Sequence, residues 1–204
     1  MRIRWGALHD TRATPPMLLT RRPLPRQMVP DLSVPLVGGP RWRLCDQKPQ
    51  HFTMLLFYRG LHCPECKAYL QEAEARHRAF RAQGVSVIAL SCDDEARGIA
   101  TETDWGLELL PLAYGLTTLQ ARAYGLYLSR GRPGHLTPLG LEEPQIFVEP
   151  GLFLIRPDRT LYFASVQNMP FARPPLGEVL RMIEWTVASG SPARGDADEP
   201  PEPA

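Results

Sequence analysis

The chain has 204 residues, of which 44% are hydrophobic and 22% are charged, and its formal net charge is +1. These values are typical of a soluble globular protein with one main domain, and they give no electrostatic reason to expect nucleic acid or an anionic membrane as a partner. Because no apolar run reaches the roughly 18 residues of a membrane span and the basic N-terminus lacks the apolar core of a secretory signal, we expect a cytoplasmic protein with no membrane contact.

The two ends of the chain show no hydrophobic periodicity. Residues 1–27 are rich in Arg and Pro, and they predict a loosely ordered basic arm. Residues 190–204 have no apolar anchor, and they predict a disordered tail. The folded domain is therefore expected to span residues 28–189.

Strand and helix patterns alternate in the first half of this domain. The segment DLSVPLVGGPRWRL, residues 31–44, predicts two short strands around a Gly-Gly turn. Residues 53–59 form a continuous apolar run that is typical of a buried central strand. Residues 64–83 follow as a helix that Gly84 ends. The side chains expected on the inward face of this helix are Cys66, Tyr69, Leu70, Ala73, His77 and Phe80.

The second half continues the alternation. Residues 85–92, VSVIALSC, predict another buried strand, and Asp93 or Asp94 can cap a helix that runs to about Asp104. A third helix is predicted over residues 117–127.

A hairpin and a last helix complete the pattern. Residues 151–166 predict two strands around a Pro-Asp turn, and residues 174–189 predict the closing helix. Strand, helix, strand, helix, hairpin and helix together predict an α/β fold with a central mixed β-sheet flanked by helices.

Two of the four cysteines, Cys63 and Cys66, lie three residues apart where the predicted strand gives way to the helix. Pro64 suits the first helical position. A thiolate at Cys63 would face the unsatisfied N–H groups and the positive end of the helix dipole, which lower a thiol pKa. Cys66 lies one turn on, close enough for a disulfide. The spacing predicts an exposed attacking sulfur at Cys63 and a recessed resolving sulfur at Cys66.

Three neighbours act on this pair in different directions. Arg59 and His62 would stabilise a thiolate if they are protonated or donate hydrogen bonds, whereas the carboxylate of Glu65 would oppose it. The sequence leaves open that Arg59 is a solvated charge at a strand end and that His62 is a surface histidine.

Other uses of the cysteine pair are less well supported. A structural zinc site needs four ligands, usually with a second closely spaced pair, and the remaining cysteines and the five histidines do not cluster. The c-type haem motif is excluded because Lys67 stands where it needs histidine. We therefore expect no metal and no cofactor. The strand–Cys-x-x-Cys–helix context favours redox chemistry, with two packed, inert thiols as the alternative.

These residues resemble the thioredoxin superfamily. Over roughly residues 28–190 the chain resembles its peroxiredoxin-like branch, the redoxins of the alkyl hydroperoxide reductase and thiol-specific antioxidant type. The segments that carry the resemblance are VPDLSVPLVGG, FYRGLHCPECKAYL, VSVIALSCDDE, ARAYGLY, GLFLIRPDRTLY and MPFARP. The resemblance implies a thioredoxin-like fold with an N-terminal β-hairpin extension. It also implies a peroxide or disulfide substrate and a dithiol reductant such as a thioredoxin, and it is compatible with a homodimer.

The sequence departs from the peroxiredoxin pattern at the site. Peroxiredoxins typically carry a proline seven residues and a threonine three residues before the attacking cysteine, and here these positions are Leu56 and Gly60. Their arginine would fall at about Pro150. Thioredoxins carry a cis-proline at that place, so we expect a cis Glu149–Pro150 bond near Cys63.

The resemblance therefore leaves three functions open. The first is a peroxidase in which the side chain of Arg59 and the N–H groups at the helix start replace the usual peroxide donors. The second is a thioredoxin-type disulfide reductase with little peroxidase activity, and the third is a non-catalytic zinc-binding or interaction module. The segment NMPFARPP, residues 168–175, is either a loop against the active site, a subunit contact or a plain connector.

Overall fold

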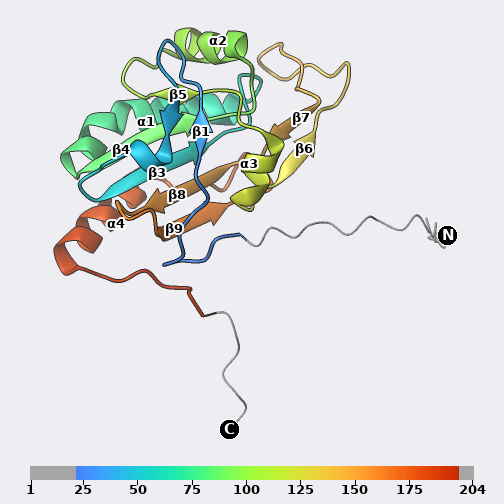
Figure 1. The fold of residues 1–204 in the computed structure, drawn as a ribbon. Coiled ribbons are helices and arrows are strands. Elements are labelled where there is room, and N and C mark those ends of the chain that lie inside the picture. Colours follow the sequence, from blue (N-terminus) through green and yellow to red (C-terminus); the bar gives the residue numbers. More distant parts are fainter. Residues whose placement is uncertain (1–21, 198–204) are drawn as a thin grey trace, which may run out of the picture.

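The computed structural model describes residues 22–197 (Figure 1). Its main sheet has five strands in the order β5-β4-β3-β8-β9. The strands are β3 (Phe52–Phe57), β4 (Val85–Leu90), β5 (Leu112–Ala113), β8 (Gly151–Ile155) and β9 (Leu161–Val166). The first three run parallel, and the β8–β9 hairpin joins them antiparallel through β3. The mixed sheet predicted from the sequence is therefore confirmed.

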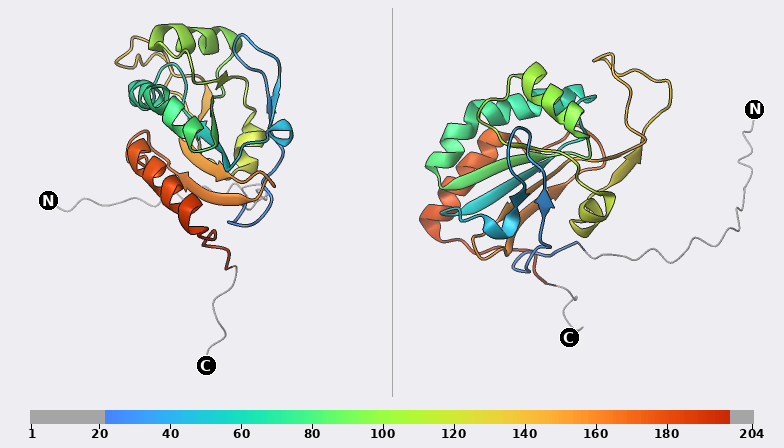
Figure 2. Two further views of the ribbon diagram at one scale, coloured as in Figure 1. Left: turned by 90° about the vertical axis from the view of Figure 1, so that its left-hand side faces the viewer. Right: turned by 45° about the horizontal axis from the view of Figure 1, so that its top comes forward.

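Helices cover one face of this sheet. The two long helices, α1 (Pro64–Ala82) and α4 (Leu176–Ser189), lie side by side on it (Figure 2). A third helix, α2 (Glu95–Trp105), lies at the β5 edge, and the side chain of Asp94 caps it by accepting from the backbone N–H of Arg97, as the sequence predicts.

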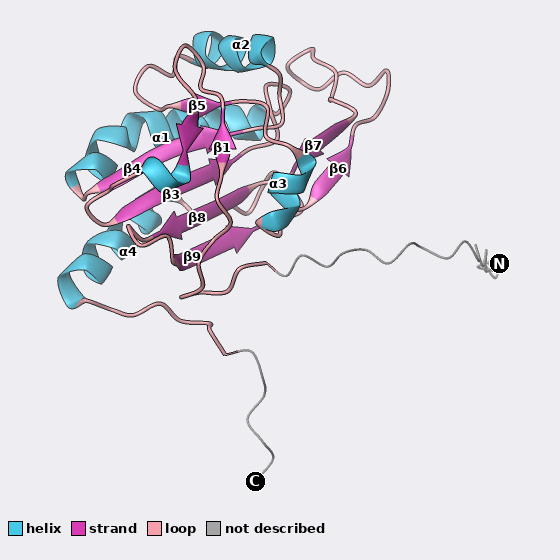
Figure 3. Ribbon diagram, in the orientation of Figure 1, coloured by secondary structure: helices cyan, strands magenta, loops and turns pink. Residues whose placement is uncertain are grey.

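The opposite face is covered by smaller elements. They are the short helix α3 (Thr118–Ala123), the one-turn helix η1 (Leu44–Asp46) and the hairpin of β1 (Ser33–Val34) and β2 (Trp42–Arg43) (Figure 3). The hairpin confirms the predicted N-terminal extension of the fold.

Two hydrophobic cores, one on each face of the main sheet, explain why the central strands are mostly apolar. Successive side chains of a strand point to opposite faces of the sheet. In β3, Met54 and Leu56 therefore pack under α1 and α4, while Leu55 and Phe57 pack under α3 and the N-terminal hairpin. A strand buried on both faces needs few polar positions, and Thr53 is the one polar residue of β3.

A second small sheet was not predicted. Strands β6 (Leu128–Arg130) and β7 (Ile146–Val148) pair antiparallel beside α3 (Figure 1). Each strand has only three residues, and the loop between them is rich in Gly and Pro. Such a pattern carries no periodicity from which a strand is recognised. This hairpin matters below because it supplies two carboxylates to the active-site loop.

The described ends of the chain lie against the hairpin of the main sheet. The backbone N–H of Arg26 donates to the carbonyl of Leu161 at 2.8 Å, and its side chain donates to the carbonyl of Ala193 and pairs with Asp196. The rest of the predicted arm and tail lies outside the described residues. Within residues 22–197, no helix has the length and apolar character to cross a membrane.

Candidate active site

The two cysteines lie at the start of α1, after the loop that follows β3. Cys63 is the N-cap of the helix, with extended backbone dihedrals, and Pro64 occupies the first helical position. The Sγ atom of Cys63 accepts a hydrogen bond of 3.2 Å from the backbone N–H of Cys66. The Cys63 sulfur therefore caps the helix in place of the side-chain oxygen that usually does so, and it faces the positive end of the helix dipole.

Both sulfurs are buried. Cys63 is 1% exposed and Cys66 is 0% exposed, and both are free thiols. The prediction of an exposed Cys63 is therefore wrong. The reason is the capping geometry, which turns Sγ back over the first helical turn and away from solvent.

An arginine far away in the sequence reaches the second sulfur. The Nη2 atom of Arg173 donates to Sγ of Cys66 at 3.0 Å. Its guanidinium lies over the ring of Tyr69, and the hydroxyl of Tyr69 donates to the carbonyl of Pro174 at 2.8 Å. The segment 168–175 thus lies against the cysteine pair, one of the placements left open by the sequence, but no sequence signal assigned a role to Arg173.

A carboxylate stands beside the first sulfur. The Sγ of Cys63 is 3.7 Å from Oε2 of Glu65, a distance at which the thiol donates to the carboxylate. The sequence predicted that Glu65 opposes a thiolate here, and the geometry agrees with that prediction.

The surroundings shift the two thiol pKa values in opposite directions. Burial raises the pKa of Cys66, but the hydrogen bond from Cys63 and the charge and hydrogen bond of Arg173 outweigh burial, and the pKa falls to about 7. The hydrogen bond to Cys66 raises the pKa of Cys63, and burial raises it further. The helix end alone therefore does not decide which sulfur ionises.

The side chain of Arg59 is held away from the sulfurs. Its guanidinium is 3.4 Å from Oε1 of Glu143 and 3.5 Å from Oε2 of Glu149, and it lies over the ring of Phe147. These partners belong to the β6–β7 hairpin and the loops beside it. The backbone N–H of Arg59, and not its side chain, donates a hydrogen bond to Cys66 and lowers the pKa of that thiol.

His62 is a buried, neutral residue. It is 0% exposed, which excludes the surface histidine that the sequence left open. Its ring lies 4.8 Å from that of Phe147, and Nδ1 is 3.5 Å from Nη2 of Arg97. Burial and the charges of Arg59 and Arg97 lower its pKa to about 4, so at neutral pH His62 adds no positive charge beside the sulfurs.

This buried histidine predicts a loss of stability in mild acid. The unfolded chain protonates His62 near pH 6.5, whereas the folded protein keeps it neutral down to about pH 4. The unfolded state therefore binds the extra proton between these values, and the free energy of unfolding falls by about 2 kcal/mol as pH drops from 6.5 to 4. Urea unfolding across this range should show a shallower dependence in His62→Gln. The exposed His135→Gln is the control, and an equal slope in all three proteins would contradict the prediction.

Asp93 fixes the loop that carries the cysteines. Its buried carboxylate accepts the backbone N–H of Leu61 at 2.8 Å and pairs with Arg97 at 2.9 Å. It lies so close to Gly60 that a Cβ at that position would be 2.6 Å from Oδ2. The sequence predicts only a helix-capping role for Asp93 and Asp94. The structure confirms that role for Asp94, whereas Asp93 holds the loop.

Pro150 does not have the predicted geometry. The described residues contain no cis peptide bond, so the prediction of a cis Glu149–Pro150 bond is wrong. The backbone N–H of Glu149 donates to the carbonyl of Tyr127, and the carbonyl of Pro150 accepts from the N–H of Gln167. This pairing on both sides keeps the chain extended here, which suits a trans Glu149–Pro150 bond. Pro150 still lines the same small cavity as Arg173, which contacts Cys66.

Two pockets differ in their relation to the cysteines. One of about 420 Å³ is lined by Glu65, Tyr69, Phe171 and Arg173, and so reaches the partners of both sulfurs. We call it the approach pocket; Glu65 and Arg173 in its lining contact the two sulfurs, while the sulfurs themselves do not line it.

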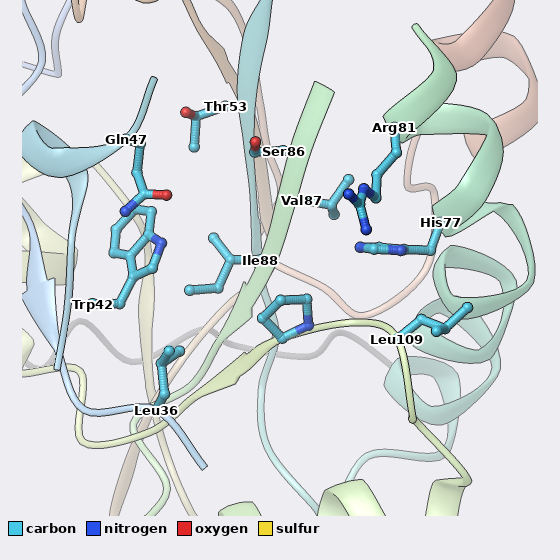
Figure 4. Close-up of a pocket in the computed structure, with 11 residues that line it drawn as sticks. Leu36, Trp42, Gln47, Thr53, His77, Arg81, Ser86, Val87, Ile88 and Leu109 are labelled. Atoms are coloured by element: carbon cyan, nitrogen blue, oxygen red, sulfur yellow. The ribbon is translucent and has the colours of Figure 1, made fainter. Parts of the chain in front are cut away.

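The other pocket lies at the open edge of β4. It has a volume of about 360 Å³, and Figure 4 shows Trp42 and Gln47 on one side of the strand and His77 and Arg81 on the other. His77 is eleven residues beyond Cys66 on α1, roughly 16 Å along the helix. This pocket therefore does not belong to the cysteine site.

No metal site accompanies the cysteines in the described part of the chain. Between residues 22 and 197, no group of three or more His, Cys, Asp or Glu side chains is arranged to hold a metal ion.

Comparison with known proteins gives a consistent result. The model of the AhpC/TSA family matches residues 25–164. A peroxidoxin, BcpB, from Mycobacterium tuberculosis superposes with a TM-score of 0.62 at 18% identity, covering 80% of this chain and 98% of the other. A mutant of the peroxiredoxin 6 of Arenicola marina gives 0.63 at 20%, covering 87% and 80%. The reduced 2-Cys peroxiredoxin of Plasmodium vivax gives 0.64 at 15%, covering 81% and 97%. No curated protein matches the sequence.

Proposed function

The chain belongs to the AhpC/TSA family, and from this premise we propose that it is a thiol-dependent peroxidase that reduces hydroperoxides through Cys63 and Cys66. Family membership suggests a thiol peroxidase that takes a peroxide substrate and a thiol reductant. The observation that carries the assignment to these two residues is the placement of both free sulfurs in the first turn of α1, with an arginine on one of them.

The chemistry has three steps. The Cys63 sulfur attacks one oxygen of the hydroperoxide, the O–O bond breaks, and Cys63 becomes a sulfenic acid while an alcohol or water leaves. The sulfur of Cys66 then attacks the sulfenic sulfur, water leaves, and an intramolecular disulfide forms. An external dithiol such as a thioredoxin reduces the disulfide by exchange.

The donors for the peroxide oxygens differ from those of typical peroxiredoxins. The positions of the usual threonine and arginine hold Gly60 and Pro150, which have no side-chain donor. The guanidinium of Arg59 faces two carboxylates. Arg173 lines the approach pocket and contacts Cys66, so it supplies the positive charge at the site, and backbone N–H groups of the loop supply the remaining donors.

Disulfide reduction is the second candidate. The Cys-x-x-Cys spacing is typical of thioredoxins, and the threonine of peroxiredoxins is missing, so the same pair would accept a protein disulfide in place of a peroxide. The two functions are separated by the rate at which the reduced protein reacts with hydrogen peroxide, compared with its rate of reducing a protein disulfide. The third function, a zinc-binding or interaction module, predicts one zinc per chain and no reducible disulfide.

The proposed peroxidase makes a stoichiometric prediction. One equivalent of hydrogen peroxide should remove two of the four thiols of the reduced protein, counted with a thiol reagent. Mass spectrometry of the digested product should then find a Cys63–Cys66 disulfide. A Cys45→Ser control should lose the same two thiols. Loss of Cys45 or Cys92 in place of the pair, or no thiol loss at a peroxide excess, would refute the proposal.

A further inference from the structure

Opposite charges stand beside the two sulfurs of the pair. The guanidinium of Arg173 is 3.0 Å from Sγ of Cys66, whereas the carboxylate of Glu65 is 3.7 Å from Sγ of Cys63. A cation favours an anion at its neighbour, and a carboxylate favours a neighbour that keeps its proton and donates it. The charges therefore place the negative charge of the reduced pair on the second cysteine, against the order that the helix end alone would give.

We propose that Cys66, held by Arg173, is the resting thiolate of the reduced pair, and that it takes the proton of Cys63 when Cys63 attacks the substrate. This inference rests on the proposed function for its second half, since the attack needs a substrate. Its first half concerns the reduced protein alone. Cys66 is then a catalytic base as well as the resolving sulfur, and Arg173 is a positioning residue.

The groups that face the pair agree with this assignment. The guanidinium of Arg173 and the backbone N–H of Arg59 donate to the sulfur of Cys66. The thiol of Cys63 lies beside this sulfur and carries one proton, which either Cys66 or Glu65 accepts. The phenol of Tyr58, which directly follows β3, stays neutral because burial and the charges of Asp93 and Cys66 raise its pKa. Cys63 meets Glu65, the one carboxylate among these groups.

Burial raises the pKa of Cys66, but the hydrogen bond from Cys63 and the charge and hydrogen bond of Arg173 outweigh burial. The hydrogen bond to Cys66, burial and the charge of Cys66 raise the pKa of Cys63 against the lowering effect of the Arg173 charge.

The proton inventory balances. In the resting state Cys63 is a thiol and Cys66 is a thiolate. The proton moves from Cys63 to Cys66 as the Cys63 sulfur bonds to one peroxide oxygen and the O–O bond breaks. The departing alkoxide takes this proton from Cys66 and leaves as the alcohol. The Cys66 thiolate then displaces hydroxide from the sulfenic sulfur, and hydroxide takes a proton from solvent to give water. The two cysteines lose two electrons, which the peroxide gains.

The segment that carries Arg173 is built to hold it in place. Ala172, the residue before it, has a φ of 61°, a left-handed backbone conformation that residues other than glycine rarely adopt. The hydroxyl of Tyr69 holds the carbonyl of Pro174 on the other side, and its ring stacks under the guanidinium. The contacts of Tyr69 therefore fix both the backbone after Arg173 and its guanidinium, which keeps its charge at the Cys66 sulfur without reorganising during the reaction.

Thiolate absorbance at 240 nm, followed against pH in the reduced protein, tests the assignment without any substrate. The wild type should show one ionisation near pH 7 per chain. Cys45 and Cys92 have raised pKa values and ionise at higher pH. Cys63→Ser should keep the ionisation near pH 7, because a serine hydroxyl still donates to Cys66, whereas Cys66→Ser should lose it or raise its midpoint by more than one pH unit.

Arg173 is tested in the same titration. Arg173→Met should raise the midpoint by at least one pH unit, a tenfold change in the acid dissociation constant, and Arg173→Lys should restore part of the shift. Arg181→Met, on the exposed face of α4, is the matched control and should leave the midpoint unchanged. Circular dichroism confirms that each variant is folded.

Two results would overturn the inference. In one, the ionisation near pH 7 survives Cys66→Ser and disappears in Cys63→Ser, which would place the thiolate on Cys63. In the other, a folded Arg173→Met protein titrates like the wild type. Neither result bears on whether the pair reduces peroxides, and a protein that titrates as expected but ignores peroxide would refute the proposed function alone.

Discussion

Replacing Cys63 with serine should reduce peroxide turnover by at least about 10³-fold, because the hydroxyl that takes the place of the thiol is not ionised at neutral pH and cannot accept oxygen from a peroxide. We expect the remaining sulfur of Cys66, which is fully buried and accepts a hydrogen bond from Arg173, not to replace Cys63 as the attacking group. Turnover is measured by following hydrogen peroxide consumption in the presence of a thioredoxin and its reductase.

The matched variant Cys66→Ser should fail at a different step. It keeps the attacking sulfur but loses both the base and the resolving sulfur. The first oxidation should therefore slow by about 10²-fold, the range of a lost general base. It should stop at a sulfenic acid on Cys63 that a dimedone reagent traps. Two results in the Cys63→Ser protein would show that the attacking residue has been misassigned. One is undiminished peroxide turnover, and the other is a sulfenic acid on Cys66.

The parts of the site that were predictable from sequence are those fixed by local geometry. Cys63 and Cys66 lie three positions apart in the sequence, and one helical turn brings them together wherever the helix lies. Pro64 and the apolar run before the pair placed the helix start correctly. The elements of the fold were predictable for the same reason, since β3 and α1 carry strong periodic patterns.

The parts that were missed depend on tertiary contacts. Arg173 is 107 residues from Cys66, and Asp93 is 32 residues from Leu61. Their contacts arise from the packing of separate elements, which no single-sequence pattern reports. Burial of Cys63 was missed because helix capping by the sulfur and cover from neighbouring loops are three-dimensional properties.

The structure also explains one departure from the family pattern. Peroxiredoxins typically carry threonine where this chain has Gly60. Here the carboxylate of Asp93 fills the space in which a side chain would stand, and Gly60 has a φ of 129°. The carboxylate of Asp93 holds the loop by accepting a hydrogen bond from the N–H of Leu61, and the missing side chain of Gly60 leaves room for this carboxylate.

Gly60→Ala should therefore strongly destabilise the protein through the active-site loop. A φ of 129° costs a residue with a Cβ on the order of 1–3 kcal/mol. The contact of 2.6 Å with Asp93 adds to that cost, because moving the carboxylate breaks its bonds to Leu61 and Arg97. We expect the free energy of unfolding to fall by about 3–4 kcal/mol in urea. Gly134→Ala is the control, since Gly134 also has a positive φ but nothing within 4 Å of its added Cβ, and it should cost about 1–2 kcal/mol.

A double-mutant cycle with Asp93→Ala separates the two causes. If the carboxylate is what excludes a side chain, Gly60→Ala should cost about 2 kcal/mol less in the Asp93→Ala protein than in the wild type, because only the backbone conformation is then penalised. Peroxide oxidation of Cys63 should slow in Gly60→Ala, since the loop that positions it shifts with Asp93. Equal costs in both backgrounds would mean that the backbone alone demands glycine. The carboxylate would then hold the loop without excluding the threonine that peroxiredoxins carry there.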